Sequence, residues 1–323
     1  MRAVRYHDAG GPGVLRLEEI DRPEPAPGEL LVEIRAASVN PVDAKLRAAH
    51  APSEPKTTGS DLAGVVSAVG ERVDGYEVGE RVFATGLHTD RFTGGSFADY
   101  AVVPTDLLAP IPDGVSFQQA AAVALVGVTA WRAFVHHANV EPGETVLIHG
   151  GNGGVGHVAI GLADALGASS VTTARPEHHD TVSAFGADAV LDYDRDDLAD
   201  AIRSETSGVD AVLDHMPGTY FETDIEVSAF GGCIVVIAGG DAPIPNAGAA
   251  RSKELQFSMM SMSNLATHPD LPNIGPILSR LGTLLDDGRL EVSIDRTLPL
   301  EDAAEAHRAV IEESVVGKIV VTP

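Results

Sequence analysis

Apolar residues recur along the chain with two different periods. Between Glu144 and Ile237, short β-branched runs alternate with stretches in which apolar residues lie three and four positions apart. Strands that alternate with helices in this way predict right-handed βαβ units around a buried parallel sheet. We expect strands at residues 144–149, 170–174, 189–192, 210–214 and 232–237, and helices at residues 155–166 and 177–185.

The chain before Glu144 has a different pattern. Two β-rich runs, residues 30–40 and 61–69, are separated by prolines and glycines. This punctuation favours an irregular all-β domain over further βαβ units. Towards the other end, apolar residues between Ile277 and Leu285 have helical spacing, and a strand is expected at residues 315–321. A length of 323 residues also favours two domains.

A glycine-rich segment joins the first strand and the first helix of the alternating region. Its sequence, HGGNGGVGHVAI, covers residues 149–160. Gly151, Gly153 and Gly156 fit the dinucleotide-binding pattern G-x-G-x-x-G, and Gly150, Gly153 and Gly156 fit a related spacing of three. The pattern allows a tight turn, close approach of pyrophosphate to the backbone, and anion binding at the helix start. The candidate contacts are Gly150, Gly151, Asn152, Gly153, Gly154, Val155 and Gly156. A plain turn remains the alternative.

The end of the second expected strand distinguishes the two nicotinamide cofactors. An acidic residue there would bind the ribose hydroxyl of NAD, whereas an arginine would accept the 2′-phosphate of NADP. This sequence has Thr173, Ala174 and Arg175, with no carboxylate until Glu177. We therefore expect NADPH, with Thr173 and Arg175 among its contacts. The alternative is that Arg175 is a solvated loop residue.

Composition excludes several classes of partner. Lys and Arg total 22 against 47 Asp and Glu, a net charge of −25, with the acidic residues spread along the chain. Such a surface repels nucleic acid and anionic membranes. In concentrated salt this self-repulsion is screened, so we expect the cytoplasm of a halophile.

The sequence has no uninterrupted apolar run of about 18 residues, the length that a membrane span requires, and residues 1–8 do not resemble a secretory signal. The lone cysteine, Cys233, supplies neither an internal disulfide nor a multi-cysteine zinc site.

Several segments together resemble the medium-chain dehydrogenase/reductase superfamily. They are ASVNPVD at 37–43, GSDLAGVV at 59–66, GERV at 79–82, GGSFADY at 94–100, VGVTAW at 126–131, GAD at 186–188 and GKIVV at 317–321. The resemblance covers nearly the whole chain. It implies a GroES-like β-rich catalytic domain at residues 1–122 and 263–323, and a Rossmann domain at residues 123–262. It also implies a substrate cleft between the domains and a homodimer.

Two positions indicate the branch. Zinc-dependent relatives carry cysteine and histidine where this sequence has Asn40 and Ser60, and their four-cysteine lobe is missing here. A catalytic zinc site would be difficult to assemble from these residues. The chain therefore resembles the zinc-free NADPH:quinone oxidoreductases, the zeta-crystallin-like branch, for which we expect NADPH and no zinc.

This resemblance implies candidate site residues. Asn40 and Asp43 would lie near the nicotinamide, with Thr129 approaching the same ring from the start of a linker helix; a simple turn at residues 40–43 is the alternative. Arg175 and Tyr193 would bound the adenosine phosphate, and Ala238 and Gly239 would line the nicotinamide side.

The expected reaction is hydride transfer from NADPH to a quinone, an enone or another conjugated carbonyl. The alternatives are an enoyl-thioester reductase and a non-catalytic NADPH-binding protein. The loop at residues 46–61 contains no tyrosine, and His50 is its only titratable aromatic side chain. We therefore name no general acid and expect protons to come from solvent.

Overall fold

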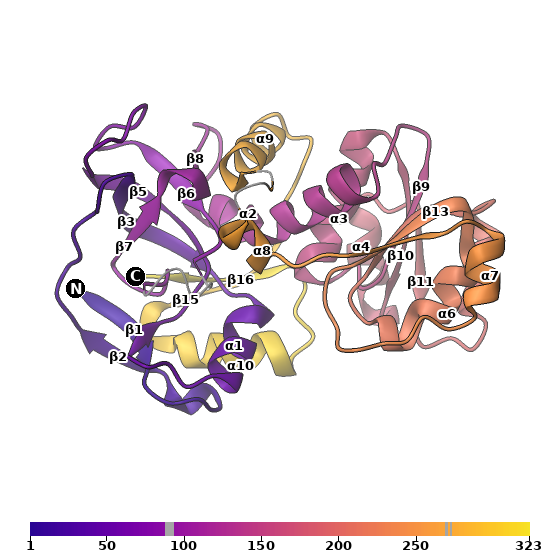
Figure 1. Cartoon of the computed structure of the whole chain (residues 1–323), viewed down its shortest axis with the longest axis horizontal. Coiled ribbons are helices and arrows are strands. Elements are labelled where there is room, and N and C mark those ends of the chain that lie inside the picture. The colour runs from indigo at the N-terminus through magenta and orange to yellow at the C-terminus, as the bar shows by residue number, and fades with distance from the viewer. Residues whose placement is uncertain (88–93, 269–270, 272) are drawn as a thin grey trace. The chain divides into compact units, whose positions relative to one another are not determined.

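The computed structural model describes residues 1–87, 94–268, 271 and 273–323. It divides into two compact units (Figure 1). The first, which we call the β-rich unit, comprises Met1–Val128, Met262–Gly288 and Val292–Pro323; the second, the α/β unit, comprises Thr129–Ser261 and Arg289–Glu291. None of the described helices is long and apolar enough to cross a membrane.

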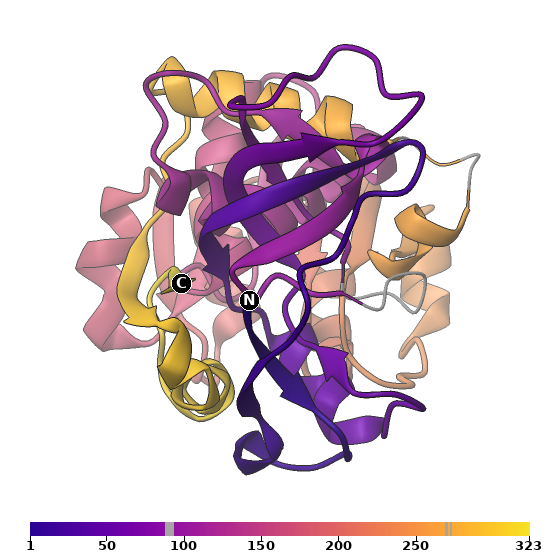
Figure 2. The same ribbon diagram turned by 90° about the vertical axis from the view of Figure 1, so that its left-hand side faces the viewer.

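The β-rich unit is built around strand β3 (Glu29–Ser38). Its strands are β1 (Arg2–Tyr6), β2 (Arg16–Glu19), β3, β4 (Lys56–Thr57), β5 (Asp61–Val69), β6 (Arg81–Ala84), β7 (Tyr100–Pro104), β8 (Leu108–Pro110), β15 (Ile294–Pro299) and β16 (Lys318–Thr322). Its helices are α1 (Pro41–Ala49), most of α2 (Phe117–Trp131), α8 (Ser263–Thr267), α9 (Ile274–Asp286) and α10 (Ala303–Glu312), with short 3₁₀ turns at Pro12–Val14, Thr105–Leu107 and Leu300–Asp302. Figure 2 faces this unit.

Three strands share the edges of β3. The larger sheet has the order β15-β16-β3-β5-β6-β8, with β7 also paired to β3, and β2-β1-β4 forms a separate small sheet. β5 lies antiparallel along one edge of β3. The other edge is divided, because β7 pairs with the first half of β3 and β16 pairs with Ala37 and Ser38 at its end. The end of β3 and the starts of β5 and β16 therefore meet at one place.

The α/β unit contains one parallel sheet of six strands. They are β9 (Thr145–Ile148), β10 (Ser169–Ala174), β11 (Ala189–Asp192), β12 (Val209–Asp214), β13 (Ser228–Val236) and β14 (Gln256–Met259). Its helices are α3 (Gly154–Leu166), α4 (His179–Ala184), α5 (Leu198–Glu205), α6 (Pro217–Val227) and α7 (Ala247–Ser252), with a 3₁₀ turn at Pro176–His178. The sheet order β11-β10-β9-β12-β13-β14 is the Rossmann order. The two expected domains, one doubly wound and one β-rich, are both confirmed.

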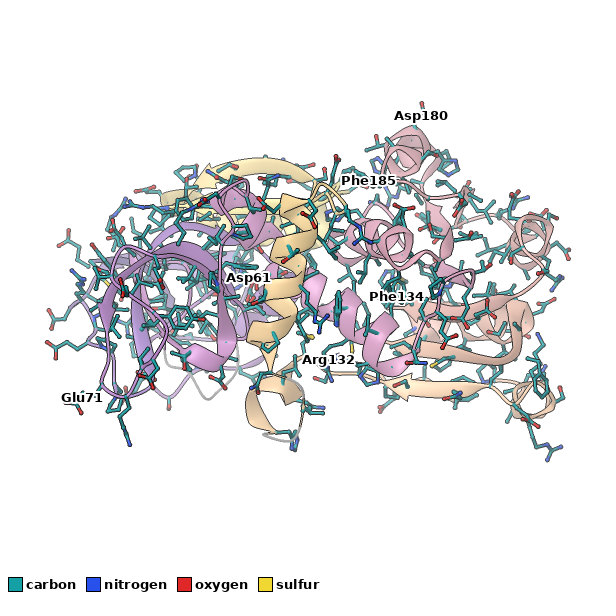
Figure 3. The ribbon with its side chains drawn as sticks, turned by 90° about the horizontal axis from the view of Figure 1, so that it is seen from above. Asp61, Glu71, Arg132, Phe134, Asp180 and Phe185 are labelled. Atoms are coloured by element: carbon teal, nitrogen blue, oxygen red, sulfur yellow. The ribbon has the colours of Figure 1, made fainter. Side chains whose placement is uncertain are left out.

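Two helices differ from the sequence-based expectation. Thr129 was expected at the start of a linker helix, but α2 begins twelve positions earlier, so Thr129 lies in its last turn. α2 is apolar on every side, so no amphipathic period marks its start. α2 instead begins with a capping box formed by Ser116 and Gln119. The Ser116 hydroxyl accepts a hydrogen bond from the Gln119 N–H at 3.2 Å, and the Gln119 side chain accepts one from the Ser116 N–H at 3.0 Å. After Trp131 the chain continues as a π-helical turn, Arg132–His137, on which Figure 3 labels Arg132 and Phe134.

The second helix, α1, was not expected at all. It begins directly after Asn40, with Pro41 in its first turn. Asn40 and Asp43 form a capping box in which the Asn40 N–H donates to Asp43 Oδ2 at 3.0 Å. The residue types that suggest a turn are also those that start a helix, which is why the pattern was ambiguous.

Candidate functional site

The glycine-rich segment forms the connection between β9 and α3. A Cβ atom on Gly151 would lie 2.4 Å from Thr172 Oγ1, and one on Gly156 would lie 2.1 Å from the Gly150 carbonyl oxygen. Gly150 has a φ of 74°, in the left-handed region that glycine adopts without strain. The close packing of loop, strand and helix therefore requires glycine at these positions.

The start of α3 is suited to an anion. Gly153 is its N-cap and has no side chain to cap the helix, so the first-turn N–H groups of Gly154, Val155 and Gly156 have no acceptor within the helix. These four residues come from the predicted fingerprint, and Asn152 lies half-buried beside them. The backbone and the helix dipole at this position match what a pyrophosphate requires.

Thr173 holds the glycine loop from behind. Its hydroxyl accepts a hydrogen bond from the Gly150 N–H at 3.1 Å, and its carbonyl accepts one from the Gly151 N–H at 2.8 Å. The side chain is 1% exposed. In this structure Thr173 supports the loop rather than facing the surface.

A buried cluster of ionisable side chains, His149, Asp214 and Asp224, follows the strands next to the glycine loop, and the sequence alone did not predict it. His149, at the end of β9, places Nε2 2.8 Å from Asp224 Oδ1, and its ring stacks on Tyr220 at 3.9 Å. Asp214, at the end of β12, is fully buried. Burial, and then the neighbouring Asp224 carboxylate, raise the pKa of Asp214 to about 6. His149 and Asp224 lie 75 residues apart, a separation at which no local sequence pattern points to a pair.

Arg175 and Tyr193 come together at the ends of β10 and β11. Arg175 Nε donates to the Tyr193 hydroxyl at 3.3 Å, and Arg175 Nη1 lies 3.8 Å from Glu177 Oε1. The Arg175 side chain is 53% exposed, so its guanidinium can still reach a ligand. Ala238 and Gly239 follow the end of β13 and are exposed; Gly239 has a φ of 111° and backs onto Pro217.

The predicted catalytic residues Asn40 and Asp43 lie in the β-rich unit, in a buried polar cluster. Asn40 is 1% exposed, and its Nδ2 donates to Ser60 Oγ at 3.0 Å and to Asp61 Oδ2 at 2.8 Å. Its Oδ1 accepts from Lys318 Nζ at 2.5 Å. Both amide protons of Asn40 are therefore already donated within the protein.

Thr129, the third predicted catalytic residue, is 5% exposed and belongs to the α/β unit.

Asp43 has an unusual protonation state. The side chain is 3% exposed, and Oδ1 accepts no hydrogen bond from the described part of the chain. Burial, and then the Asp61 carboxylate, raise its pKa to about 7. The Asn40 N–H, the Lys318 ammonium and the nearby Ser60 hydroxyl, which falls short of full hydrogen-bond geometry, oppose this rise. With a pKa of about 7, the Asp43 carboxyl group is partly protonated at neutral pH.

Asn40 and Ser60, which the sequence resemblance assigns to the zinc-ligand positions of zinc-dependent relatives, contact each other here. Asn40 presents an amide donor and Ser60 a hydroxyl, and the two are hydrogen-bonded. Neither is a ligand that zinc prefers. Among residues 1–87, 94–268, 271 and 273–323, no three His, Cys, Asp or Glu side chains gather as a metal site. The donor set at Asn40 and Ser60 does not fit catalytic zinc.

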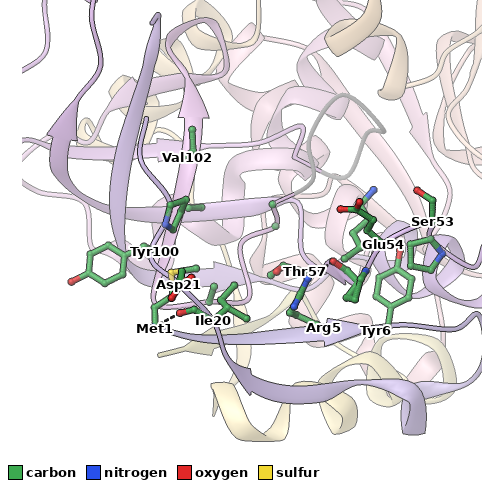
Figure 4. Close-up of a pocket in the computed structure, with 18 of the residues that line it drawn as sticks. Met1, Arg5, Tyr6, Ile20, Asp21, Ser53, Glu54, Thr57, Tyr100 and Val102 are labelled. Carbon is green, nitrogen blue, oxygen red and sulfur yellow. Dashed lines mark hydrogen bonds between the residues drawn. The ribbon is translucent and has the colours of Figure 1, made fainter. Parts of the chain in front are cut away.

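A pocket of about 1000 Å³ opens within the β-rich unit (Figure 4). Arg5 and Tyr6 line it from β1, Tyr100 lines it from β7, and Leu46 and His50 line it from the end of α1. Arg5 donates to Pro55 O at 2.5 Å and pairs with Glu18 at 3.3 Å. The pocket therefore has a mixed polar and apolar wall next to the helix that begins at Asn40.

Comparisons with known proteins show the family of the chain. The family model for the alcohol dehydrogenase GroES-like domain matches residues 26–113, and the model for zinc-binding dehydrogenases matches residues 185–321. The quinone oxidoreductase of Mus musculus is 31% identical over 97% of this chain and 95% of its own. A mycobacterial protein solved in complex with NADPH has a TM-score of 0.87 and 30% identity over 100% of both chains. An NAD-dependent alcohol dehydrogenase has a TM-score of 0.88 and 32% identity over the same coverage.

The chain belongs to the medium-chain dehydrogenase/reductase superfamily of oxidoreductases. Within that superfamily it is similar over nearly its whole length to quinone oxidoreductases from mammals and from Pseudomonas aeruginosa.

Proposed function

We propose that this protein is a zinc-independent, NADPH-dependent reductase of quinones or other conjugated carbonyl compounds. The observation that carries the proposal is the hydrogen bond of 3.0 Å between Asn40 Nδ2 and Ser60 Oγ, the two residues that the sequence resemblance assigns to zinc-ligand positions. Without a Lewis acid, the acceptor itself must be electrophilic, and quinones meet this requirement. The quinone oxidoreductase relatives support the same substrate class.

The α/β unit supports a nicotinamide dinucleotide. Gly151 and Gly156 leave the backbone close to the place of the pyrophosphate, and the first turn of α3 offers its N–H groups. Bound NADPH supplies the hydride. Relatives include one structure with NADPH and one NAD-dependent enzyme, so the choice of NADPH rests on Arg175. Its guanidinium follows β10 directly and is exposed, as a 2′-phosphate contact requires.

The first test is NADPH oxidation with a small benzoquinone in multimolar potassium chloride, with NADH in parallel. We expect turnover that favours NADPH and that survives a zinc chelator. Loss of activity with the chelator and its return with zinc would overturn the zinc-free assignment. A preference for NADH would contradict the role of Arg175.

Two variants test whether Arg175 contacts the 2′-phosphate of NADPH. Arg175→Leu should raise the KM for NADPH by about 10-fold or more and leave the KM for NADH nearly unchanged, since a charge-assisted contact to phosphate is lost. The matched control is Arg195→Leu, because Arg195 is also in this region but pairs with Asp197 at 2.7 Å. An equal effect of the two variants would indicate a general effect of charge.

The same assay separates the alternatives. Turnover of enoyl thioesters but not of quinones or enones would identify an enoyl-thioester reductase. Tight NADPH binding without turnover of any of these acceptors, in protein that circular dichroism shows to be folded, would identify a binding protein.

We also infer a homodimer, which the exposed edge of the α/β sheet supports. β14 is the last strand of that sheet, and its Met259 is 59% exposed. An unpaired edge strand with an apolar side chain is a natural place for a second copy. Light scattering after gel filtration should give twice the mass of the chain, and Met259→Lys should shift it towards the monomer.

A further inference from the structure

Lys318 is a buried lysine at the meeting point of three strands. It is the first residue of β16 and is 3% exposed. Its Nζ donates to Val39 O at 2.8 Å and to Asn40 Oδ1 at 2.5 Å. An ammonium group is rarely buried without a partner charge, so its surroundings must compensate for the lost solvent.

Two carboxylates offset part of the cost of burying this ammonium group. Asp61, labelled in Figure 3, is fully buried at the start of β5. It accepts hydrogen bonds from Ser38 Oγ at 2.6 Å, Asn40 Nδ2 at 2.8 Å and Thr85 Oγ1 at 2.5 Å. Asp43 belongs to the first turn of α1. Burial lowers the pKa of Lys318, whereas Asp61 and Asp43 raise it.

The charges that act on Asp43 come from different elements. Asp61 on β5 is a like charge and favours a proton on Asp43, and Lys318 on β16 is an opposite charge and disfavours it. Arg47, on α1 itself, directs its guanidinium to Gly10 O at 2.9 Å and to Ala44 O at 3.4 Å. Burial is the main cause of the raised pKa of Asp43, and the opposing charges of Asp61 and Lys318 then shift that pKa in opposite directions.

We propose that Lys318 is a positioning residue of the reduction site, which fixes the amide of Asn40 and, in opposition to Asp61, controls the proton held by Asp43. The proposal rests on the proposed function in placing Asn40 and Asp43 at that site. Asp43 is the carboxyl group of this cluster whose pKa is raised to about 7, so it can hold a proton near neutral pH. Lys318 thus holds the amide of Asn40 through its Nζ and places an ammonium group within the same buried cluster as Asp43 and Asp61.

The direct test follows the Asp43 carboxyl group by ¹³C NMR during a pH titration of the whole protein without cofactor. Asp43→Asn identifies the signal. Lys318→Met removes the opposite charge and should raise the titration midpoint by about 1 unit or more. Asp61→Asn removes the like charge and should lower the midpoint by a similar amount. The Thr85 hydroxyl can rotate to accept from the new amide.

The two single variants are expected to shift the titration midpoint of Asp43 in opposite directions, so each one checks the other. If Lys318→Met does not fold, Asp61→Asn still tests the balance, and Lys318→Met with Asp61→Asn should return the midpoint close to that of the parent. Lys45→Met is the control, because Lys45 is exposed on α1 and should leave the midpoint unchanged. Equal shifts of one sign in both single variants, or no shift, would overturn the proposal.

A second readout connects the cluster to catalysis. The pH profile of kcat with benzoquinone should move in the same direction as the NMR midpoint in each variant, with the Kd for NADPH unchanged. If the NMR midpoints move as expected but no acceptor is reduced, the proposed function fails while the role of Lys318 in the protonation of Asp43 stands. If the protein is active and the midpoints do not move, the role of Lys318 fails alone.

Discussion

Arg175 Nε lies 3.3 Å from the hydroxyl oxygen of Tyr193, and this contact links the ends of two neighbouring strands of the α/β sheet. It fixes the direction of a guanidinium group that is otherwise exposed. The neighbouring Glu177 carboxylate, 3.8 Å away, holds the same group more loosely. A preorganised guanidinium loses less conformational entropy when it binds a phosphate.

Tyr193→Phe should therefore weaken NADPH binding without affecting NADH. We expect the KM for NADPH to rise by about 2- to 5-fold, because the lost hydrogen bond orders one side chain. Steady-state kinetics with both cofactors measure the effect. An equal rise of both KM values would instead mean that Tyr193 shapes the pocket as a whole.

Gly151→Ala should disrupt the glycine loop. The new Cβ would lie 2.4 Å from Thr172 Oγ1 and 2.9 Å from Val182 Cγ1, so the loop must shift. We expect a loss of about 1 to 3 kcal/mol in the free energy of unfolding and a loss of about 10-fold or more in NADPH affinity. Gly218→Ala is the control, since nothing lies within 4 Å of its Cβ position. Urea unfolding and fluorescence titration of NADPH measure the two effects, and similar behaviour of the two variants would contradict the packing argument.

The contribution of Asp43 and Asp214 to stability should decrease as pH rises through the acidic range. The folded-state pKa values of Asp214, about 6, and Asp43, about 7, lie above the ordinary value of 3.8, so the native state binds protons more tightly than the unfolded chain. Their contribution is fully present below about pH 4 and is lost as pH rises through 6 to 7.

Asp214→Asn should remove its share of this dependence. Relative to the parent, the variant should gain about 2.5 kcal/mol in the free energy of unfolding between pH 4 and pH 8, given about 1.4 kcal/mol for each unit of pKa shift. Asp180→Asn, at an exposed position on α4, should show no such gain. A difference between Asp214→Asn and the parent that does not depend on pH would contradict the raised pKa.

Salt should stabilise the whole chain. The net charge of −25 creates repulsion that extends about 10 Å at 0.1 M salt and about 3 Å at 1 M. We expect the midpoint of thermal unfolding to rise by several degrees from 0.1 M to multimolar potassium chloride. An unchanged midpoint would remove the basis for the expectation of a halophilic setting.

Local patterns predict those features whose cause is local. The glycine segment, the strand before it and the helix after it follow from neighbouring residues, and β11 at Ala189–Asp192 has the expected bounds. Arg175 follows from its place after the second strand, and the family resemblance adds Tyr193 beside the same phosphate; the structure places the two side chains in contact. Their assignment to the cofactor remains a proposal.

The contacts of the buried Lys318 could not be predicted from local sequence patterns. Lys318 and Asn40 are 278 residues apart, and Lys318 is one lysine in a GKIVV strand that reads as ordinary core. Its neighbours are fixed by the pairing of β16 with β3, which is a property of the sheet. The helix after Asn40 was missed for another reason, because its capping residues also fit a turn.

The divided edge of β3 has a consequence during protein synthesis. β7 covers the first half of that edge early, but the second half waits for β16, whose Lys318 is made 278 residues after Asn40. At typical translation rates of about 5 to 20 residues per second, this delay is roughly 15 to 55 seconds. During that time the α/β unit can be completed, while Ala37 and Ser38 present an open strand edge. An open edge can pair with another chain, so the nascent chain is exposed to wrong pairing at this place until β16 has been made.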